Sequence, residues 1–294
     1  MTFFKGKGQV QVPCHGFLNL FWRFWEGRQQ MAKLCPLFSG SSGNSIYVGN
    51  SEAGILVDAG RSARQLAQAL GRCGIPIAAV KAVFVTHEHV DHVKGLRVFA
   101  ERNRVPVYSS PGTLRTLEEN GCLTPKISEF VAPPGGVECA GMMIRPFHMS
   151  HDCAEGVGYK IFTGDDRKVA ISTDLGYISD EVMGELETSD LVVLESNHDV
   201  GMLQNGPYPY PLKRRILSDV GHLSNAACAE ALPGLAEKGT TRFVLAHLSA
   251  ENNTPELAYQ TALCSLTIAG FRQDEDFQLT VAPRVNETGK ILLF

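Results

Sequence analysis

Residues 86–92 read Thr-His-Glu-His-Val-Asp-His, and this run constrains the chain more than any other part of it. It follows residues 80–85, whose apolar and β-branched side chains predict a buried strand. Alternate residues at the end of a strand point to the same side, so His87 and His89 are expected to converge. The chain then turns into a helix, which aims Asp91 and His92 at a second point nearby. Imidazoles and a carboxylate suit zinc, manganese or iron, so the run predicts a metal centre.

The composition is that of an ordinary globular protein. The 294 residues are 44% hydrophobic and 20% charged, which allows a sizeable core without disulfides. The net charge of −4 gives no general affinity for nucleic acid, so any phosphate-binding surface has to be a local patch. Eight cysteines without a Cys-x-x-Cys pair indicate reduced thiols and a cytoplasmic protein. No apolar run approaches the roughly 20 residues that a transmembrane segment needs.

Strand and helix patterns begin just after Met31, so we expect residues 1–30 to be a poorly ordered N-terminal extension and residues 31–294 to form one domain. Short β-rich segments with interspersed helices predict two sheets covered by helices. The predicted strands are 34–38, 45–49, 54–57, 80–85, 105–109, 142–146, 157–162, 168–172, 191–194, 243–245 and 278–282. The predicted helices are 63–73, 93–104, 111–120, 225–237 and 255–269.

The run Thr-His-x-His-x-Asp-His resembles the signature of the metallo-β-lactamase superfamily, whose members form a four-layer αββα sandwich with two metal ions at one edge. The resemblance implies that His151 is the third ligand of the first metal. It also implies that Asp174 bridges both metals and that His247 completes the second site. Two divalent ions, zinc, manganese or iron, are then the expected cofactors. The implied ligands are His87, His89, Asp91, His92, His151, Asp174 and His247.

Each of the downstream ligands has a plainer alternative. His148 competes with His151, because either side chain could reach the site from the same loop, and the position in the motif favours His151. Asp174 could instead cap the N-terminus of a helix, and His247 could be a packed core histidine. Only the meeting of these residues with the run 86–92 would distinguish a metal centre from these alternatives.

Four further motifs narrow the resemblance to the YycJ/WalJ-type exonuclease family, and it extends from Met31 to the last residue. These motifs occupy residues 38–45, 195–199, 221–225 and 246–253. The spacing of the implied ligands leaves no room for the long arm of tRNA 3′-endonucleases or for the inserted domain of β-CASP nucleases. The family implies an enzyme that hydrolyses DNA phosphodiester bonds with metal ions, in the 5′ to 3′ direction on duplex DNA.

The implied ligand set does not include His222. In related phosphodiesterases a histidine at this place acts on the phosphate or the leaving oxygen. We therefore expect His222 to be the general acid. The alternative is a plain loop residue ahead of the helix that begins at Asn225. In this hypothesis Asp91 and Asp174 orient the nucleophile, and His222 either protonates the leaving oxygen or stabilises charge on the phosphoryl group.

Expected substrate contacts lie around this centre. Lys213 and Arg214 share a predicted loop with the Pro-Tyr-Pro-Tyr-Pro run 207–211, and basic groups beside aromatic rings suit contacts to a nucleic acid. A charge run is, however, more often an ordinary solvated surface. The Gly/Ser-rich loop 39–44 could cradle a phosphate with its backbone amides or could simply form a tight turn. The expected contacts are His222, Lys213, Arg214, Ser42, Asn44 and His198.

Other functions fit the same ligands. A small-molecule phosphodiesterase or thioester hydrolase would have a narrow, enclosed pocket, and a nuclease of this type could also act on RNA. A non-catalytic metal-sensing or partner-binding module could retain the fold. The intact ligand set argues against such a module, because pseudo-enzymes tend to lose at least one ligand.

Overall fold

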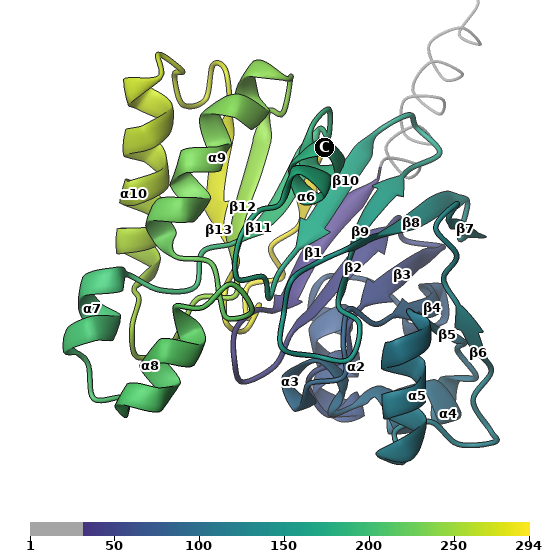
Figure 1. Cartoon of the computed structure of the whole chain (residues 1–294). Coiled ribbons are helices and arrows are strands. Elements are labelled where there is room, and N and C mark those ends of the chain that lie inside the picture. Colours follow the sequence, from purple (N-terminus) through teal and green to yellow (C-terminus); the bar gives the residue numbers. More distant parts are fainter. Residues whose placement is uncertain (1–31) are drawn as a thin grey trace, which may run out of the picture.

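The strands form two mixed sheets of seven strands each in the computed structural model of the chain, which describes residues 32–294 (Figure 1). In its sheet order, the first sheet contains β14 (Leu292–Leu293), β1 (Lys33–Phe38), β2 (Ser45–Gly49), β3 (Gly54–Val57), β4 (Val80–Phe84), β5 (Val107–Ser109) and β6 (Glu129–Val131). The second contains β13 (Gln278–Val281), β12 (Arg242–Ala246), β11 (Leu191–Glu195), β10 (Lys168–Ser172), β9 (Val157–Phe162), β8 (Met142–His148) and β7 (Val137–Cys139). The expected extension, residues 1–30, lies outside the described residues.

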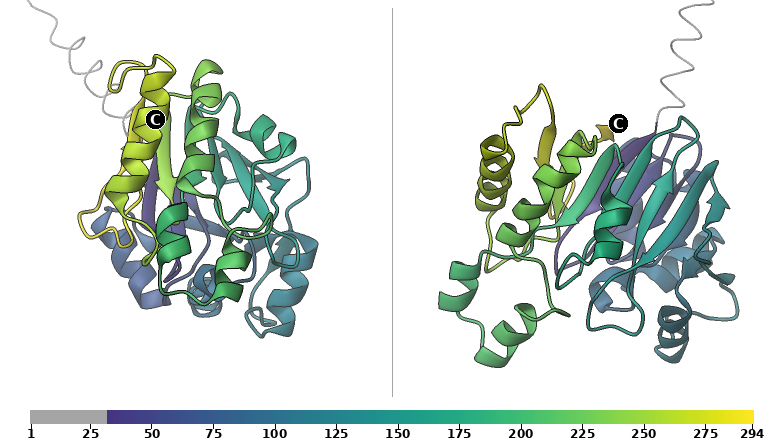
Figure 2. Two further views of the ribbon diagram at one scale, coloured as in Figure 1. Left: turned by 60° about the vertical axis from the view of Figure 1, so that its left-hand side comes forward. Right: turned by 45° about the horizontal axis from the view of Figure 1, so that its top comes forward.

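Helices cover the outer face of each sheet, which gives four layers in the order αββα (Figure 2). The helices on the first sheet are α2 (Ala63–Arg72), α4 (Leu96–Asn103) and α5 (Pro111–Glu119). Those on the second are α6 (Asp180–Leu186), α9 (Asn225–Glu237) and α10 (Pro255–Ile268). The shorter elements are η1 (Ile77–Ala79), α3 (Val90–Val93), α7 (Val200–Asn205) and α8 (Tyr210–Ile216). The predicted sandwich is therefore confirmed.

Successive side chains of a strand point to opposite faces of its sheet, and in these sheets both faces are covered, one by the other sheet and one by helices. In β3, Ile55 and Val57 face the layer between the sheets, whereas Leu56 packs under the outer helices. Strands that are buried on both faces are apolar throughout rather than alternating with polar residues. Each fully buried aliphatic side chain contributes about 1.5–3 kcal/mol to folding, so these layers supply much of the stability. Phe84 of β4 stacks on Tyr108 of the neighbouring strand β5 with ring centroids 4.8 Å apart, and across the central layer it meets Tyr159 of β9 edge-on at 5.5 Å.

The elements differ from the prediction mainly near the metal-binding run. The predicted helix 93–104 is interrupted at Lys94 and Gly95, between α3 and α4. Gly95 packs against the backbone of Arg61, whose oxygen would lie 1.9 Å from an added side-chain carbon. The segment around the Pro-Tyr-Pro-Tyr-Pro run was expected to be a loop, but it contains the helix α8. No helix among the described residues is long and apolar enough to cross a membrane.

Candidate metal centre

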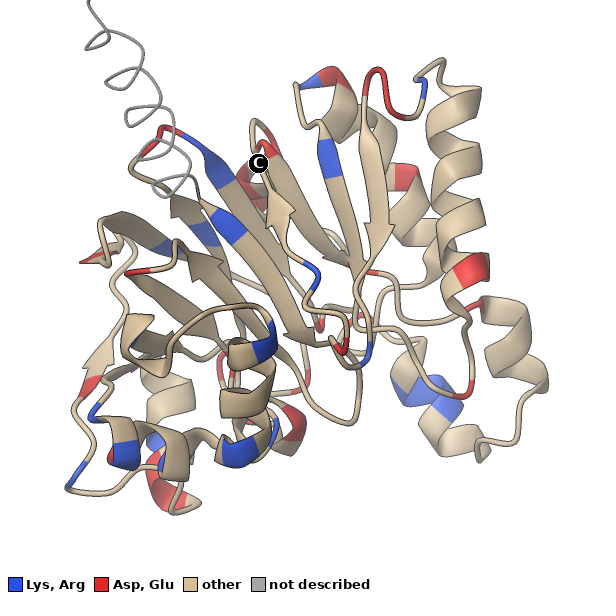
Figure 3. Ribbon diagram, turned by 180° about the vertical axis from the view of Figure 1, so that it is seen from behind, with Lys and Arg blue, Asp and Glu red and all other residues tan. Residues whose placement is uncertain are grey.

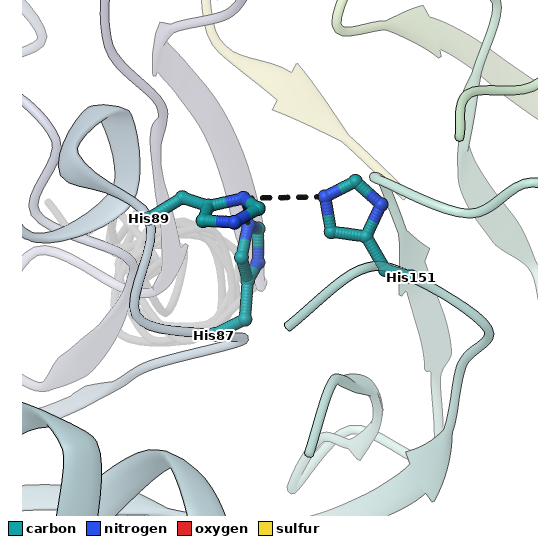
Figure 4. A group of neighbouring side chains, drawn as sticks. All are labelled: His87, His89 and His151. Atoms are coloured by element: carbon teal, nitrogen blue, oxygen red, sulfur yellow. Dashed lines mark hydrogen bonds between the residues drawn. The ribbon is translucent and has the colours of Figure 1, made fainter. Parts of the chain in front are cut away.

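The predicted ligands leave the two sheets at one end of the sandwich. The run 86–92 follows β4 of the first sheet, while Asp174 and His247 follow β10 and β12 of the second. The strands β10, β11 and β12 are parallel, so the residues that follow them emerge at the same edge. His151 lies in the loop between β8 and β9 and approaches from the side opposite to His87 (Figure 4).

Three imidazoles form the first metal-binding group. His87 Nε2 lies 3.0 Å from His89 Nδ1, and His151 Nε2 lies 3.3 Å from the same atom (Figure 4). Nitrogen ligands about 2.0–2.1 Å from a tetrahedral zinc ion are about 3.3–3.4 Å apart, which is close to these spacings. The three rings point their nitrogens at one another, and the group therefore has the arrangement of a three-histidine metal site.

The second group combines two histidines with two carboxylates. Asp91 Oδ2 lies 3.6 Å from His92 Nε2 and 3.6 Å from His247 Nε2. Asp174 Oδ2 lies 3.1 Å from His92 Nε2, and Asp174 Oδ1 lies 4.0 Å from His151 Nε2 in the first group. One aspartate therefore faces both groups, which is the position expected for a bridging carboxylate.

Two buried carboxylates, not singled out from the sequence, hold the ligand rings in place. Asp58 Oδ2 lies 2.8 Å from His92 Nδ1, and the same side chain accepts hydrogen bonds from the backbone and hydroxyl of Thr86. Glu195 Oε1 lies 2.8 Å from His247 Nδ1 and 2.9 Å from His222 Nδ1. Such second partners fix which ring nitrogen faces a metal and orient the ring.

Left-handed backbone conformations accompany these side chains. Asp58, Asp174 and His247 have φ angles of 64°, 63° and 55°, and each follows the end of a strand. A non-glycine residue in this region costs of order 1–3 kcal/mol and persists only where the surroundings enforce it. The turn redirects each side chain toward the end of the sandwich, so the strain is located where the ligands are presented.

Comparisons with known proteins decide the family. A model of the beta-lactamase superfamily domain matches residues 54–248. The chain is 41% identical over 244 residues to exodeoxyribonuclease YycJ of Bacillus anthracis, a match that covers 83% of this chain and 92% of the relative. This chain belongs to the metallo-β-lactamase superfamily. It is also 37% identical to exodeoxyribonuclease WalJ of Streptococcus pneumoniae, over 84% of this chain and 93% of that protein.

A solved structure shares the fold of this superfamily member. Zn(2+)-bound PqqB from Methylobacterium extorquens aligns with a TM-score of 0.69 and 18% identity, over 89% of this chain and 100% of that one. At this identity the likeness concerns the fold alone. The metallo-β-lactamase fold implies divalent metal binding. The charges and the unpaired buried atoms of the histidine and aspartate groups show whether this chain's residues suit such an ion.

The electrostatics of the first group suit metal binding. Burial lowers the pKa of His87 well below its ordinary value, and the neighbouring His92 adds to the effect. Burial also lowers the pKa of His151. Neutral imidazoles have a lone pair available for a metal ion, whereas protonated ones do not. Both shifts therefore favour the neutral, metal-binding form of these two histidines.

The second group holds carboxylates that need a positive partner. Burial opposes the ionisation of Asp174, but His247 and His92 keep its pKa well below the usual value. Burial works against protonation of His247, yet Asp174 and the carboxylates of Asp91 and Glu195 raise its pKa to about 10. A divalent ion would replace these protons and supply the same positive charge.

Unpaired buried atoms give a further test of the fit. Asp174 Oδ2 and His247 Nε2 are buried but make no hydrogen bond of good geometry within the described part of the chain. Buried polar atoms without a partner are rare in folded proteins and call for an explanation such as an ion. Both atoms belong to the second group, so the residues present fit a divalent metal there.

Two of the expected substrate contacts reach the centre. Asn44 Nδ2 lies 3.2 Å from Asp91 Oδ2 and 3.0 Å from His92 Nε2, while its Oδ1 accepts a hydrogen bond from the backbone of Gly40. His222 lines the same cavity as the predicted ligands, and its Nδ1 lies 3.6 Å from Asp174 Oδ1. Its ring also clusters with Asp174, Glu195 and His247, four side chains close enough together to hold an ion. Asn44 thus supports the metal ligands, and His222 remains free on one side for a substrate.

The other expected contacts lie elsewhere. Ser42 is exposed and accepts a hydrogen bond from Arg61. The ammonium of Lys213 donates to two backbone carbonyls in the segment just before it, and Arg214 is exposed to solvent. His198 is buried away from the cavity, and neither ring nitrogen has a hydrogen-bond partner in the described chain.

His148, the alternative to His151, lies at the exposed end of β8 and belongs to neither metal-binding group. His151 instead sits inside the first group, where its Nδ1 donates to the backbone oxygen of Gly221 at 3.0 Å. The position in the motif therefore selected the histidine that the fold brings to the centre.

A cavity of about 360 Å³ opens over the second group. The cavity is lined by predicted ligands and by the α8 segment, residues 208–216, which consists of α8 and the two residues before it. The lining includes Asp91, Asp174, His222, His247, Tyr208 and Arg215. Sequence analysis did not single out Arg215, although it is the third member of the basic triplet that contains Lys213 and Arg214.

Proposed function

We propose that this protein is a metal-dependent exodeoxyribonuclease that holds two divalent ions, zinc or manganese, and cleaves duplex DNA in the 5′ to 3′ direction. One observation carries the proposal: seven ligand side chains from both sheets converge into two adjoining groups at a cavity that also contains His222. The two relatives, both exodeoxyribonucleases by name, support DNA as the substrate.

The ligands divide between the two ions according to their spacing. His87, His89 and His151 would hold the first ion, and Asp91, His92 and His247 would hold the second. Asp174 faces both groups and would bridge them. Bound divalent ions would lower the pKa of water toward neutrality and neutralise charge on a phosphate.

The remaining chemistry belongs to side chains of the chain itself. Asp91 and Asp174 orient the attacking water, because their carboxylates face the space between the ligand groups. His222 donates a proton to the leaving oxygen from its outer nitrogen. Burial opposes protonation of His222, but Glu195, which faces the inner nitrogen at 2.9 Å, raises the pKa of this histidine above its ordinary value, in the direction that a general acid needs.

The surroundings of the cavity suit a polymer better than a small enclosed ligand. Tyr208 lines the cavity and offers a ring for stacking against a base. Arg214 is exposed on α8 at the same end of the molecule, where it can contact a more distant phosphate. A small-molecule phosphodiesterase or a thioester hydrolase of this fold would instead need a closed pocket.

The test is a nuclease assay with purified protein and zinc or manganese. Duplex DNA labelled at the 5′ or the 3′ end is compared with single-stranded DNA, RNA and closed circular DNA. We expect early release of the 5′ label, no attack on the closed circle, and two metal ions per chain by elemental analysis. A His87→Ala variant, purified in parallel, controls for contaminating nucleases. Cleavage of the closed circle, or hydrolysis of RNA alone, would contradict the proposal.

A further inference from the structure

The three basic residues of α8 have different surroundings. Arg215 lines the cavity over the second metal-binding group together with Tyr208 and Ile216 of the same segment. Lys213 uses its ammonium to hold the backbone of the preceding segment, with N–O distances of 2.9 and 2.7 Å. Figure 3 shows the basic residues of α8 together at the end of the sandwich where the ligands gather. Only one member of the triplet therefore shares the cavity with the ligands.

Asp152 holds Arg215 in that position. The guanidinium donates from Nε and Nη2 to the two carboxylate oxygens, and the Nη2–Oδ1 distance is 2.8 Å. Asp152 directly follows the ligand His151, and its Oδ1 lies 3.4 Å from His151 Nε2. The ion pair therefore places the guanidinium beside the first metal-binding group as well as over the second.

The loop that carries Asp152 is itself fixed to the segment after α8. The backbone of Asp152 donates to the oxygen of Val220 at 3.1 Å, and His151 Nδ1 donates to the oxygen of Gly221. At Gly221 a side chain would lie 2.2 Å from the backbone oxygen of Arg215, so the segment packs closely against the end of α8. These contacts make Arg215 a positioned group rather than a freely moving surface side chain.

Arg215 also keeps capacity to bind a ligand. Its side chain is 44% exposed, and two of its five N–H donors are used by Asp152. A guanidinium presents its remaining donors in one plane, which matches two oxygens of a phosphate. The cavity is the one place where such a phosphate would also meet the metal ligands.

We propose that Arg215 binds the phosphate group that undergoes hydrolysis, and that Asp152 positions Arg215 for this contact. The inference rests on the proposed nuclease function and adds a specific substrate-binding residue to it. Any phosphodiester that enters the cavity would make the contact, whatever the length of the nucleic acid. Contacts outside the cavity, such as those of Arg214, would matter only for a long substrate.

The experiment compares two substrates of different size with the metal-loaded protein. One is end-labelled duplex DNA, and the other is the p-nitrophenyl ester of thymidine 5′-monophosphate. We expect Arg215→Ala to lower kcat/KM on both by roughly 10- to 100-fold, because a charged hydrogen-bonding partner of the phosphate is lost. Arg215→Lys retains the charge but not the planar donors and is expected to recover part of the loss. Arg102→Ala, an exposed arginine on α4, serves as the matched control and is expected to leave both rates unchanged.

Asp152→Asn tests the positioning role. The amide keeps one oxygen acceptor for the guanidinium but loses the charge, so kcat/KM is expected to fall on both substrates. An unchanged kcat/KM in Asp152→Asn would overturn the proposal. So would an unchanged kcat/KM of Arg215→Ala on the small diester, or a loss of metal content that parallels its loss of activity. We expect normal metal content in Arg215→Ala and a smaller loss in Asp152→Asn.

A binding measurement keeps this inference distinct from the proposed function. If the unaltered protein hydrolyses neither substrate, the nuclease proposal fails. Calorimetric titration of thymidine 5′-monophosphate into the metal-loaded protein still tests Arg215. We expect weaker binding to Arg215→Ala by roughly 10-fold or more. Equal affinity for both proteins would reject the phosphate contact.

Discussion

Glu195 serves two histidines with different tasks through one oxygen. Its Oε1 lies within 2.9 Å of the predicted metal ligand His247 and of His222, while Oε2 accepts hydrogen bonds from the backbones of Leu175 and Leu223. The nearby His222 helps hold the pKa of Glu195 at about 2 despite complete burial, so the carboxylate stays ionised. A charged acceptor can serve two donors at once, which a neutral amide does less well.

Replacing Glu195 by glutamine should therefore weaken both functions. The amide keeps the shape but has one oxygen instead of two, so one of the two sets of donors meets an NH₂ group. We expect metal affinity or turnover to fall by roughly 10- to 100-fold. Metal content after dialysis against a chelator, measured together with kcat, checks the prediction. Glu118→Gln on the surface of α5 is the matched control. Equal metal retention and equal kcat in both variants would show that Glu195 has no such role.

His222→Ala is predicted to retain the metal ions while losing turnover. His222 belongs to neither predicted ligand set, and removal of a general acid costs typically 10²- to 10⁴-fold in rate. Elemental analysis and kcat on DNA are the measurements. His148→Ala removes an exposed histidine from the end of β8 and is expected to change neither. A rate unchanged in His222→Ala would remove this residue from the mechanism.

At the scale of elements, the loops between strands and helices are shaped by close backbone contacts. Gly60 follows β3, and its amide donates to the backbone oxygen of Asn44 at 2.8 Å. The amide of Asn44 in turn donates to the backbone oxygen of Asp91 at 2.7 Å. A side chain at Gly60 would lie 1.7 Å from that oxygen of Asp91. The glycine therefore allows three segments to meet behind the second metal-binding group.

Gly60→Ala should destabilise the protein and displace Asp91. Overpacking of this kind costs about 1–3 kcal/mol of unfolding free energy, and weaker metal binding is expected with it. Gly71→Ala is the matched control, because it lies in α2 with no atom within 4 Å of the added carbon. That change is expected to stabilise the protein by about 0.4–1 kcal/mol. Urea unfolding measures the free energy of unfolding of both variants. Equal values for the two would show that Gly60 is not needed for the close approach of these segments.

Local sequence patterns predicted the elements well where the signal was itself local. The strands 45–49, 54–57, 157–162 and 168–172 and the helix 225–237 have the predicted bounds. The helix α8 was missed because three prolines suggested a loop, yet Pro209 precedes the helix and Pro211 lies in its first turn, where no amide hydrogen is required.

The site was predictable to the extent that its ligands lie in motifs. The run 86–92 and the family resemblance named seven of the side chains that meet there but gave no role to Glu195, which lies among them. Asp58, Glu195 and Arg215 act through contacts across long sequence distances, and a buried carboxylate has no local pattern that reveals its partner. For Asp58 and Glu195 the one available signal was a charged residue directly after, or at the end of, an otherwise apolar strand.

At the scale of the whole molecule, the metal centre connects the two sheets. His87, Asp91 and His92 come from the first sheet, and Asp174 and His247 come from the second. Ions held there would bind the folded state but not the unfolded chain. By mass action a ligand at 100 times its dissociation constant adds about 2.7 kcal/mol of stability.

Chelation should accordingly lower the melting temperature. A loss of about 2.7 kcal/mol corresponds to a shift on the order of 5 °C for a protein of this size. Differential scanning calorimetry with and without a chelator measures the shift, and added zinc is expected to restore it. If elemental analysis shows that metal has left and the melting temperature stays the same, the centre does not hold the sheets together.

The placement of His247 after β12 also bears on synthesis. The histidines of the run 86–92 leave the ribosome long before β10 and β12 exist, so the early part of a nascent chain carries an incomplete set of ligands. A chain that stops before β12 therefore contains all three histidines of the first group but lacks His247, the last side chain of the second group. The second group can thus be complete only after the greater part of the polypeptide has been synthesised.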